Sequence, residues 1–286
     1  MKICDLHTHS NNSFDAQNSV DDMCKTAIDK GLYAIAITDH CEAPGIKIGR
    51  EYKYGYFDES IPKSIKDATR AKAMYADKIK VLRGLELGEP MHDMECTQRA
   101  ISYGELDYII ASVHNIRGYE DFYYVDFNEN NVKQILKEYF YELAETAEFK
   151  HFDTLAHLSY PLRYIKNKLG YIVDLSEYQN EIDEVYKILI KNEKALEINT
   201  SGLYKGLGIT LPDQAQIKRF KELGGKYVTI GSDSHCKEDV GKGIAEGIAI
   251  AKNCGFDSYT IFENHKPVLI SIDKWMYYIW FCSTIF

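Results

Sequence analysis

Towards its end the chain reads Val228-Thr229-Ile230-Gly231-Ser232-Asp233-Ser234-His235, a β-branched run followed by polar residues. The run predicts a strand that is buried on both faces. Asp233 and His235 are two residues apart, and side chains at that spacing lie on the same side of an extended chain. A carboxylate and an imidazole on the same side of a buried strand end do not suit a hydrophobic core. Both groups are common metal ligands.

The start of the chain repeats this arrangement in Ile3-Cys4-Asp5-Leu6-His7-Thr8-His9. His7 and His9 have the same two-residue spacing and belong to an apolar strand pattern. Potential ligands therefore stand at two strand ends that are far apart in the sequence. We predict that the fold brings these two strand ends side by side.

Between these two stretches, strand patterns alternate with helix patterns. Further strands are predicted at residues 33–38, 81–87, 108–113, 154–156 and 195–199. Helices are predicted at residues 19–31, 59–79, 132–143, 176–190, 212–224 and 239–254. Strands that alternate with helices in this way indicate an α/β fold with a parallel sheet covered by helices.

Polar residues stand at the C-terminal end of nearly every predicted strand or in the loop that follows it. The candidate ligands among them are His7, His9, Asp15, His40, Glu86, His114, His157, Asp233 and His235. This pattern favours a closed or nearly closed seven-stranded, TIM-like barrel whose site lies at the C-terminal strand ends. An open doubly wound sheet is the alternative, but its site would draw on fewer strands.

The type and number of these residues indicate more than one metal ion. Zinc takes about four ligands, so nine candidates suit a cluster of two or three divalent ions. Histidine and carboxylate ligands without cysteine favour Zn, Mn or Fe over Ca or Mg.

Composition excludes several classes of function. The 286 residues carry a net charge of −9, which argues against a nucleic-acid partner and against an anionic membrane surface. Seven scattered cysteines include no Cys-x-x-Cys pair, so we expect reduced thiols and a cytoplasmic protein. No signal-peptide pattern precedes the first strand.

We divide the chain into a catalytic barrel, residues 1–270, and an apolar tail, residues 271–286. The apolar part of the tail is too short to cross a bilayer, which needs about 20 residues. The tail is interpreted as a docked segment or as a contact between copies in a homo-oligomer. An irregular terminus without a function is the alternative.

The polar strand ends together resemble the motif set of the polymerase and histidinol phosphatase (PHP) family. The matching segments are His7-Thr8-His9, Thr38-Asp39-His40, Gly84-Leu85-Glu86, Ser112-Val113-His114, Ala156-His157 and Gly231-Ser232-Asp233-Ser234-His235. They cover most of the chain and occur in the order of the family. The resemblance implies a distorted seven-stranded βα barrel that holds a trinuclear metal site.

The resemblance also implies how the ligands are shared among three metals. The expected sets are His7, His9, Glu86 and Asp233 for the first metal, Glu86, His114 and His157 for the second, and Asp15, His40 and His235 for the third. Glu86 would bridge the first two metals, and Glu86, Asp233 and His235 are the expected catalytic residues. The ions would outweigh the carboxylates locally, so an acidic protein can bind a phosphomonoester dianion.

Within the family, residues 84–90, 197–203 and 266–270 are similar to segments of the stand-alone histidinol-phosphate phosphatases of histidine biosynthesis. This similarity implies hydrolysis of L-histidinol phosphate, a small phosphorylated metabolite. Arg163 is the first candidate for a cation that binds the phosphate, with Lys205 and Arg117 as second choices. Three acids of the rim are interpreted as solvated loop charges rather than as contacts to the substrate ammonium, namely Glu42, Glu89 and Asp93.

Three other functions stay open on the sequence. Another PHP phosphoesterase, acting on nucleotides or nucleic-acid ends, would share every metal ligand, but the chain lacks basic and aromatic-basic stretches. A metal-dependent amidohydrolase commonly bridges its metals with a lysine, whereas Glu86 ends the corresponding strand here. A non-catalytic module would be expected to have lost several ligands, and none is missing.

Overall fold

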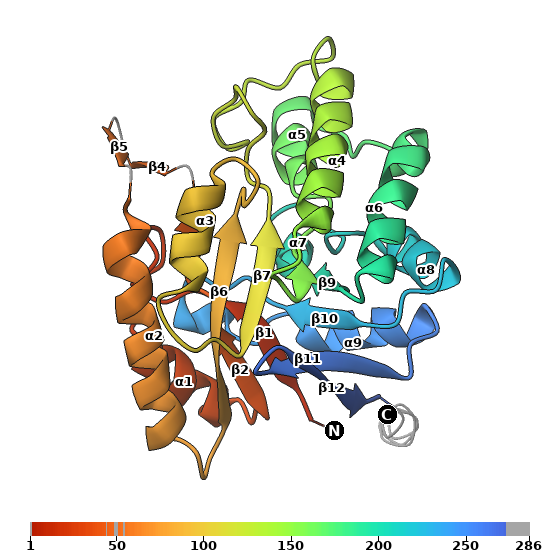
Figure 1. The fold of residues 1–286 in the computed structure, drawn as a ribbon. Helices are drawn as coiled ribbons and strands as arrows, with labels where there is room; N and C mark the ends of the chain where they lie inside the picture. Colours follow the sequence, from red (N-terminus) through yellow and green to blue (C-terminus); the bar gives the residue numbers. More distant parts are fainter. Residues whose placement is uncertain (1, 44, 49–50, 54, 273–286) are drawn as a thin grey trace.

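The structure is a computed structural model that describes residues 2–43, 45–48, 51–53 and 55–272. Most of the predicted apolar tail, residues 273–286, lies outside the described residues. A barrel of parallel strands occupies the centre, and helices surround it (Figure 1). The barrel strands are β1 (Cys4–Thr8), β2 (Ala34–Ile37), β6 (Lys80–Gly88), β7 (Tyr108–Ser112), β8 (Thr154–Leu155), β9 (Ala195–Asn199) and β10 (Val228–Gly231).

The strands follow one another around the barrel in chain order, and each pairs with its neighbour in parallel. The barrel closes where the segment after β10 returns to β1, through a parallel bridge between Thr8 and Ser234. The backbone N–H of Asp233 donates to the carbonyl of His7 at 2.8 Å, and that of His9 donates to Ser234 at 2.9 Å. The predicted barrel is therefore confirmed, and the open-sheet alternative is wrong because the first and last strands meet.

Helices connect the strands and cover the outside of the barrel (Figure 1). In the described part of the chain they are α1 (Val20–Asp29), α2 (Phe57–Met74), α3 (Met94–Ile101), α4 (Val132–Glu148), α5 (Pro161–Leu169), α6 (Gln179–Lys191), α7 (Ser201–Tyr204), α8 (Gln214–Glu222) and α9 (Ile244–Asn253). Ser19 caps α1 through a reciprocal capping box with Asp22, as that pair predicts. None of the described helices has the length and apolar character that a membrane crossing requires.

Several short elements were not predicted. They are the helices α3, α5 and α7, the strands β3 (His40–Glu42), β4 (Ile46–Ile48) and β5 (Glu51–Lys53), the hairpin of β11 (Ser258–Glu263) and β12 (Lys266–Ser271), and two 3-10 turns at Leu175–Tyr178 and Lys237–Asp239. The most important is β3, because it pairs in parallel with the second half of β6 and places His40 opposite Glu86. The first half of β6 pairs with β2 instead, so this side of the barrel is irregular.

Gly231 lets the two ends of the chain approach closely at the end of β10. A Cβ at this position would lie 2.3 Å from the Cβ of His7 and 2.7 Å from a carboxylate oxygen of Glu197. Only glycine fits there without moving the metal-site residues. Two positions later, Asp233 has a φ of 53°, a left-handed conformation that is uncommon for residues with a side chain. The turn aims the Asp233 carboxylate back over the barrel end.

Candidate metal centre

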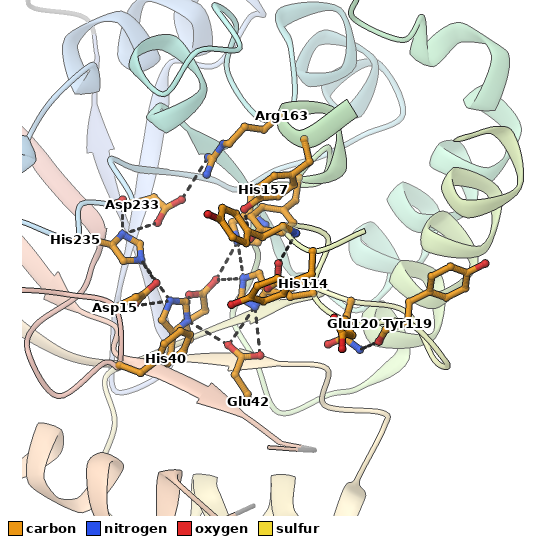
Figure 2. Close-up of a pocket in the computed structure, with 18 of the residues that line it drawn as sticks. Asp15, His40, Glu42, His114, Tyr119, Glu120, His157, Arg163, Asp233 and His235 are labelled. Atoms are coloured by element: carbon orange, nitrogen blue, oxygen red, sulfur yellow. Dashed lines mark hydrogen bonds and ion pairs between the residues drawn. The ribbon is translucent and has the colours of Figure 1, made fainter. Parts of the chain in front are cut away.

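The ends of six strands bring the predicted ligands together in one place. Figure 2 shows five of them close together, namely His40, His114, His157, Asp233 and His235. His7 lies in β1 and His9 just after it, His40 begins β3, and Glu86 lies in β6. His114, His157, Asp233 and His235 follow the ends of β7, β8 and β10 by two to four residues. Because all these strands run in parallel, their carboxyl ends meet at one rim of the barrel.

One group of side chains surrounds the Oε2 atom of Glu86. Nε2 of His7 lies 3.3 Å from that oxygen, and Nε2 of His9 lies 3.5 Å from it. Asp233 completes the group, since its Oδ1 lies 3.6 Å from Nε2 of His9. Ligand atoms of His7, His9 and Asp233 all lie within 4.8 Å of one another, a spacing at which they can share one ion.

A second group surrounds the other oxygen of the same carboxylate. Oε1 of Glu86 lies 3.3 Å from Nε2 of His114 and 3.0 Å from Nε2 of His157. The two oxygens of Glu86 therefore face two different groups of histidines. This is the arrangement expected of a carboxylate that bridges two ions.

A third group lies on the other side of His9. Asp15 offers Oδ1 to Nε2 of His40 at 3.7 Å and Oδ2 to Nε2 of His235 at 3.2 Å. Nε2 atoms of His40 and His235 are 3.4 Å apart, and His9 belongs to the same close set. Asp15 is the most accessible of the predicted ligands, with a side chain that is 39% exposed.

The donor atoms of these groups fit divalent metals. His7 Nε2, His9 Nε2, His40 Nδ1 and Glu86 Oε2 are buried and make no hydrogen bond of normal geometry, although His40 Nδ1 lies 2.9 Å from Glu86 Oε2. Buried polar atoms without hydrogen bonds are costly, so several of them aimed at common points fit a site for a cation. Nitrogen and carboxylate oxygen donors without a cysteine suit zinc and similar divalent metals.

Electrostatics keep the carboxylates of the centre ionised. Burial would raise the pKa of the Glu86 carboxyl, but the charges of His7 and His40 hold that pKa well below its usual range. Burial also opposes ionisation of Asp233, and the Lys205 ammonium and His9 lower its pKa well below the ordinary value. Both side chains are therefore in the form that binds a metal.

Two acids that were interpreted as solvated loop charges are in fact buried beside the ligands. Glu42 Oε1 lies 3.3 Å from Nδ1 of His40 and 3.2 Å from Nδ1 of His114. Glu89, only 1% exposed, accepts a hydrogen bond from the backbone N–H of His114. For Glu42 the interpretation was wrong because β3 pairs with β6 and places Glu42 beside Gly88. A Cβ added at Gly88 would lie 2.2 Å from Oε2 of Glu42, so the two residues are in close contact.

Asp93 behaves as a local structural residue. Its side chain caps α3 by accepting a hydrogen bond from the backbone N–H of Cys96 at 3.0 Å. This contact is a normal helix cap and places no charge at the metal centre.

Glu197 is a functional residue that sequence reasoning did not assign. It lies in the middle of β9, and its Oε1 accepts from Nδ1 of His7 at 2.7 Å. Its Oε2 accepts from the backbone N–H of His157 at 2.8 Å. A carboxylate behind a ligand histidine fixes the ring orientation and strengthens it as a ligand. The signal in the sequence was a lone glutamate inside an apolar strand.

We expect Glu197→Gln to weaken metal binding about 10- to 100-fold, because the amide cannot hold the His7 ring as a carboxylate does. Competition with a chromophoric chelator would measure the affinity. Glu222→Gln is the matched control, since Glu222 is half exposed and 4.0 Å from Lys218 at the surface. Equal affinities in the two variants would contradict this role.

The structure places two of the three predicted phosphate-binding cations at the centre. Arg163, in α5, donates from Nη2 to Ser201 at 2.6 Å and lies 3.8 Å from Asp233. Its Nε is buried without a hydrogen bond, so the guanidinium keeps an unused donor. Lys205 donates to the backbone carbonyl of Asp233 at 2.8 Å. Both side chains line the same cavity as the histidines.

Arg117 does not reach this cavity. Its guanidinium lies 2.5 Å from Glu145 and 3.6 Å from Glu142, two residues of α4. The two carboxylates lie near one another on α4, because residues three apart share a helix face, and together they hold the arginine away from the barrel rim. Arg117 is therefore removed from the set of substrate contacts.

The cavity over the metal centre has a volume of about 470 Å³. Metal-binding histidines, Arg163 and Lys205 form one part of its lining, and tyrosines and acids form another. The volume lies in the range of small-molecule sites. A metal cluster with basic side chains at one end can bind a phosphate group, and the remaining space can hold the rest of a small metabolite.

Known proteins match this chain over most of its length. The PHP domain family model matches residues 5–201. A histidinol-phosphatase of Lactococcus lactis is 29% identical over 274 residues, which cover 93% of this chain and 96% of the relative. A probable histidinol-phosphatase of Clostridium acetobutylicum is 30% identical over 267 residues, with 93% and 96% covered.

Two solved structures share the architecture. The crystal structure of histidinol phosphate phosphatase from Lactococcus lactis, complexed with zinc, L-histidinol and phosphate, superposes with a TM-score of 0.77 at 26% identity. The match covers 93% of this chain and 99% of that one. A putative histidinol phosphatase from Listeria monocytogenes has a TM-score of 0.70 at 20% identity, with 85% and 99% covered, and shows the same fold.

Proposed function

This chain belongs to the PHP domain family, and we propose that it is a metal-dependent phosphomonoesterase that hydrolyses L-histidinol phosphate to L-histidinol and phosphate. The observation that carries the proposal is one cavity in which a histidine-carboxylate cluster stands beside Arg163 and Lys205. Metal ions and basic side chains together complement a phosphate dianion. The relatives named for this activity align with more than nine-tenths of the chain.

We further propose that the cluster holds two or three divalent transition metals, Zn, Mn or Fe. His7, His9, Glu86 and Asp233 would bind one ion, and Glu86, His114 and His157 a second. Asp15, His40 and His235 would bind the third. When bound, such ions lower the pKa of water and stabilise charge on phosphoryl oxygens.

The side chains of the protein have three tasks in this reaction. Glu86 holds two groups of ligands in a fixed relation through its two oxygens. Arg163 and Lys205 line the cavity and place two positive charges beside Asp233, where they can attract a phosphate dianion. Glu197 and Glu42 keep His7 and His114 oriented by contacts to their Nδ1 atoms. Orientation of this kind lowers the cost of reaching the transition state.

The direct test is phosphate release from L-histidinol phosphate by purified protein in the presence of manganese, with adenosine monophosphate assayed in parallel. We expect turnover of L-histidinol phosphate and little turnover of the nucleotide. Preferred turnover of the nucleotide would retain the metal site and reject the biosynthetic role. No phosphate release from either compound, with metals bound, would favour a carbon-centred hydrolase or a non-catalytic module.

A further inference from the structure

The cavity continues beyond the metal centre along a wall that the proposed chemistry does not use. We call Asp121, Tyr123, Tyr124, Tyr160 and Tyr164 the acid-tyrosine wall, and all five residues line the cavity. The first three belong to the loop between β7 and α4, and the two others lie at the start of α5. The wall is therefore built by two separate segments that converge over the barrel rim.

Ring contacts show that the wall begins at the ligands and extends away from them. The Tyr160 ring lies 5.0 Å from the His114 ring and 4.8 Å from the His157 ring, measured between centroids. Its hydroxyl lies 2.7 Å from the hydroxyl of Tyr164. The Tyr164 ring then contacts Tyr123 at 6.1 Å. A molecule whose phosphate lies at the metals would place its remaining atoms along these tyrosines.

Asp121 is the charged member of the wall, and no basic side chain of the described residues forms an ion pair with it. Its Oδ1 accepts a hydrogen bond from the backbone N–H of Tyr123 at 2.7 Å, which fixes the carboxylate in the loop. Burial raises the pKa of the Asp121 carboxyl, and its charge in turn acts on Tyr160 and Tyr164. A carboxylate that is partly buried and lacks a cation of its own is a costly feature for a surface loop to keep.

We infer that Asp121 binds the cationic, nitrogen-bearing end of the substrate and makes the enzyme selective for phosphate esters of amino alcohols. This inference rests on the proposed function, since L-histidinol phosphate carries a protonated amine on the carbon next to its phosphate-bearing CH2 group, and an imidazole at the end opposite its phosphate. A carboxylate forms a strong charge-assisted hydrogen bond with an ammonium group. The neighbouring tyrosine faces attract the same cation and can contact the flat imidazole.

The cavity then offers both kinds of charge that the substrate needs. Arg163 and Lys205 lie beside Asp233, and Asp121 stands on the wall. A nucleotide with a second phosphate, or a nucleic-acid backbone, would bring negative charge to Asp121. The same carboxylate thus attracts an amino alcohol and repels the competing classes of phosphate ester.

The experiment compares L-histidinol phosphate with p-nitrophenyl phosphate, which carries no cation. We expect Asp121→Asn to lower the ratio of the two kcat/KM values about 10- to 100-fold, mainly through KM. Inhibition by L-histidinol should weaken by a similar factor, and inhibition by inorganic phosphate should weaken less. Asparagine keeps an oxygen that can accept from Tyr123, so the loop retains its anchor.

Asp126→Asn is the matched control, because it removes the same charge from the same loop at a side chain that is 93% exposed. A ratio in Asp121→Asn equal to that of the control, in protein that hydrolyses L-histidinol phosphate, would overturn this inference alone. Wild-type protein that hydrolyses p-nitrophenyl phosphate but not L-histidinol phosphate would overturn the proposed function, and the inference with it. The two failures are therefore distinguishable.

Discussion

Glu86→Gln is expected to lower kcat/KM for L-histidinol phosphate by about 10²- to 10⁴-fold, because removing one partner from a buried charge network costs about 3–5 kcal/mol. The carboxylate is fully buried, and its two oxygens face histidines on both sides within 3.0–3.5 Å. An amide offers one neutral oxygen in place of two charged ones. The amide oxygen of the glutamine can face one group of ligand histidines at best, and its N–H₂ group then faces the other.

Steady-state kinetics combined with metal analysis would check this prediction. We expect the variant to hold fewer metal ions per chain than wild type. Glu105→Gln is the control, because Glu105 is 87% exposed and forms an ion pair with Arg83 at 3.3 Å, away from the metal centre. A variant that kept both its metals and its activity would show that Glu86 is not the bridging ligand.

Removal of the metals is expected to abolish activity and to lower the melting temperature by about 10 °C, since a ligand present at 1,000 times its Kd stabilises the fold by about 4 kcal/mol. Without metal, Glu86 and Asp233 remain buried among histidines, and the atoms His7 Nε2 and His9 Nε2 have no hydrogen-bond partner. Those unsatisfied groups favour unfolding, where water can solvate them.

Thermal unfolding before and after treatment with a chelator would measure the effect. Manganese or zinc should restore both the melting temperature and the activity, whereas magnesium should not, because it prefers oxygen ligands. Glu86→Gln should respond less to the chelator than wild type, since it holds fewer ions from the start. An unchanged melting temperature in metal-free wild type would argue against a resident metal cluster.

Predictions that rest on local patterns agree with the structure. The run at residues 228–230 defines β10, and the Ser19–Asp22 pair begins α1, without knowledge of any partner element. The convergence of the ligands follows from the same patterns, because the carboxyl ends of parallel strands share one rim. Helix α2 illustrates the limit on boundaries: it begins at Phe57 and ends at Met74, earlier than the predicted residue 79.

Features that depend on long-range pairing could not be predicted. Strand β3 has three residues and no periodic pattern, so its existence depends on pairing with the second half of β6. Burial of Glu42 follows from that pairing alone. Arg117 is a basic residue in a rim loop, as expected of a phosphate contact, but Glu145 near the end of the following helix binds it. No local sequence pattern specifies which of several basic side chains will point into the cavity.

Closure of the barrel by its first and last strands has a consequence for the order of events during synthesis. Asp5 accepts hydrogen bonds from Ser232, 227 positions later in the chain. A ribosome adds about 5–20 residues per second, so these partners emerge about 10–45 s apart. His7 and His9 leave the ribosome early and wait as an incomplete pair until Asp233 arrives. Metal uptake at the proposed site would therefore be a late step, possible only after the first and last strands have paired.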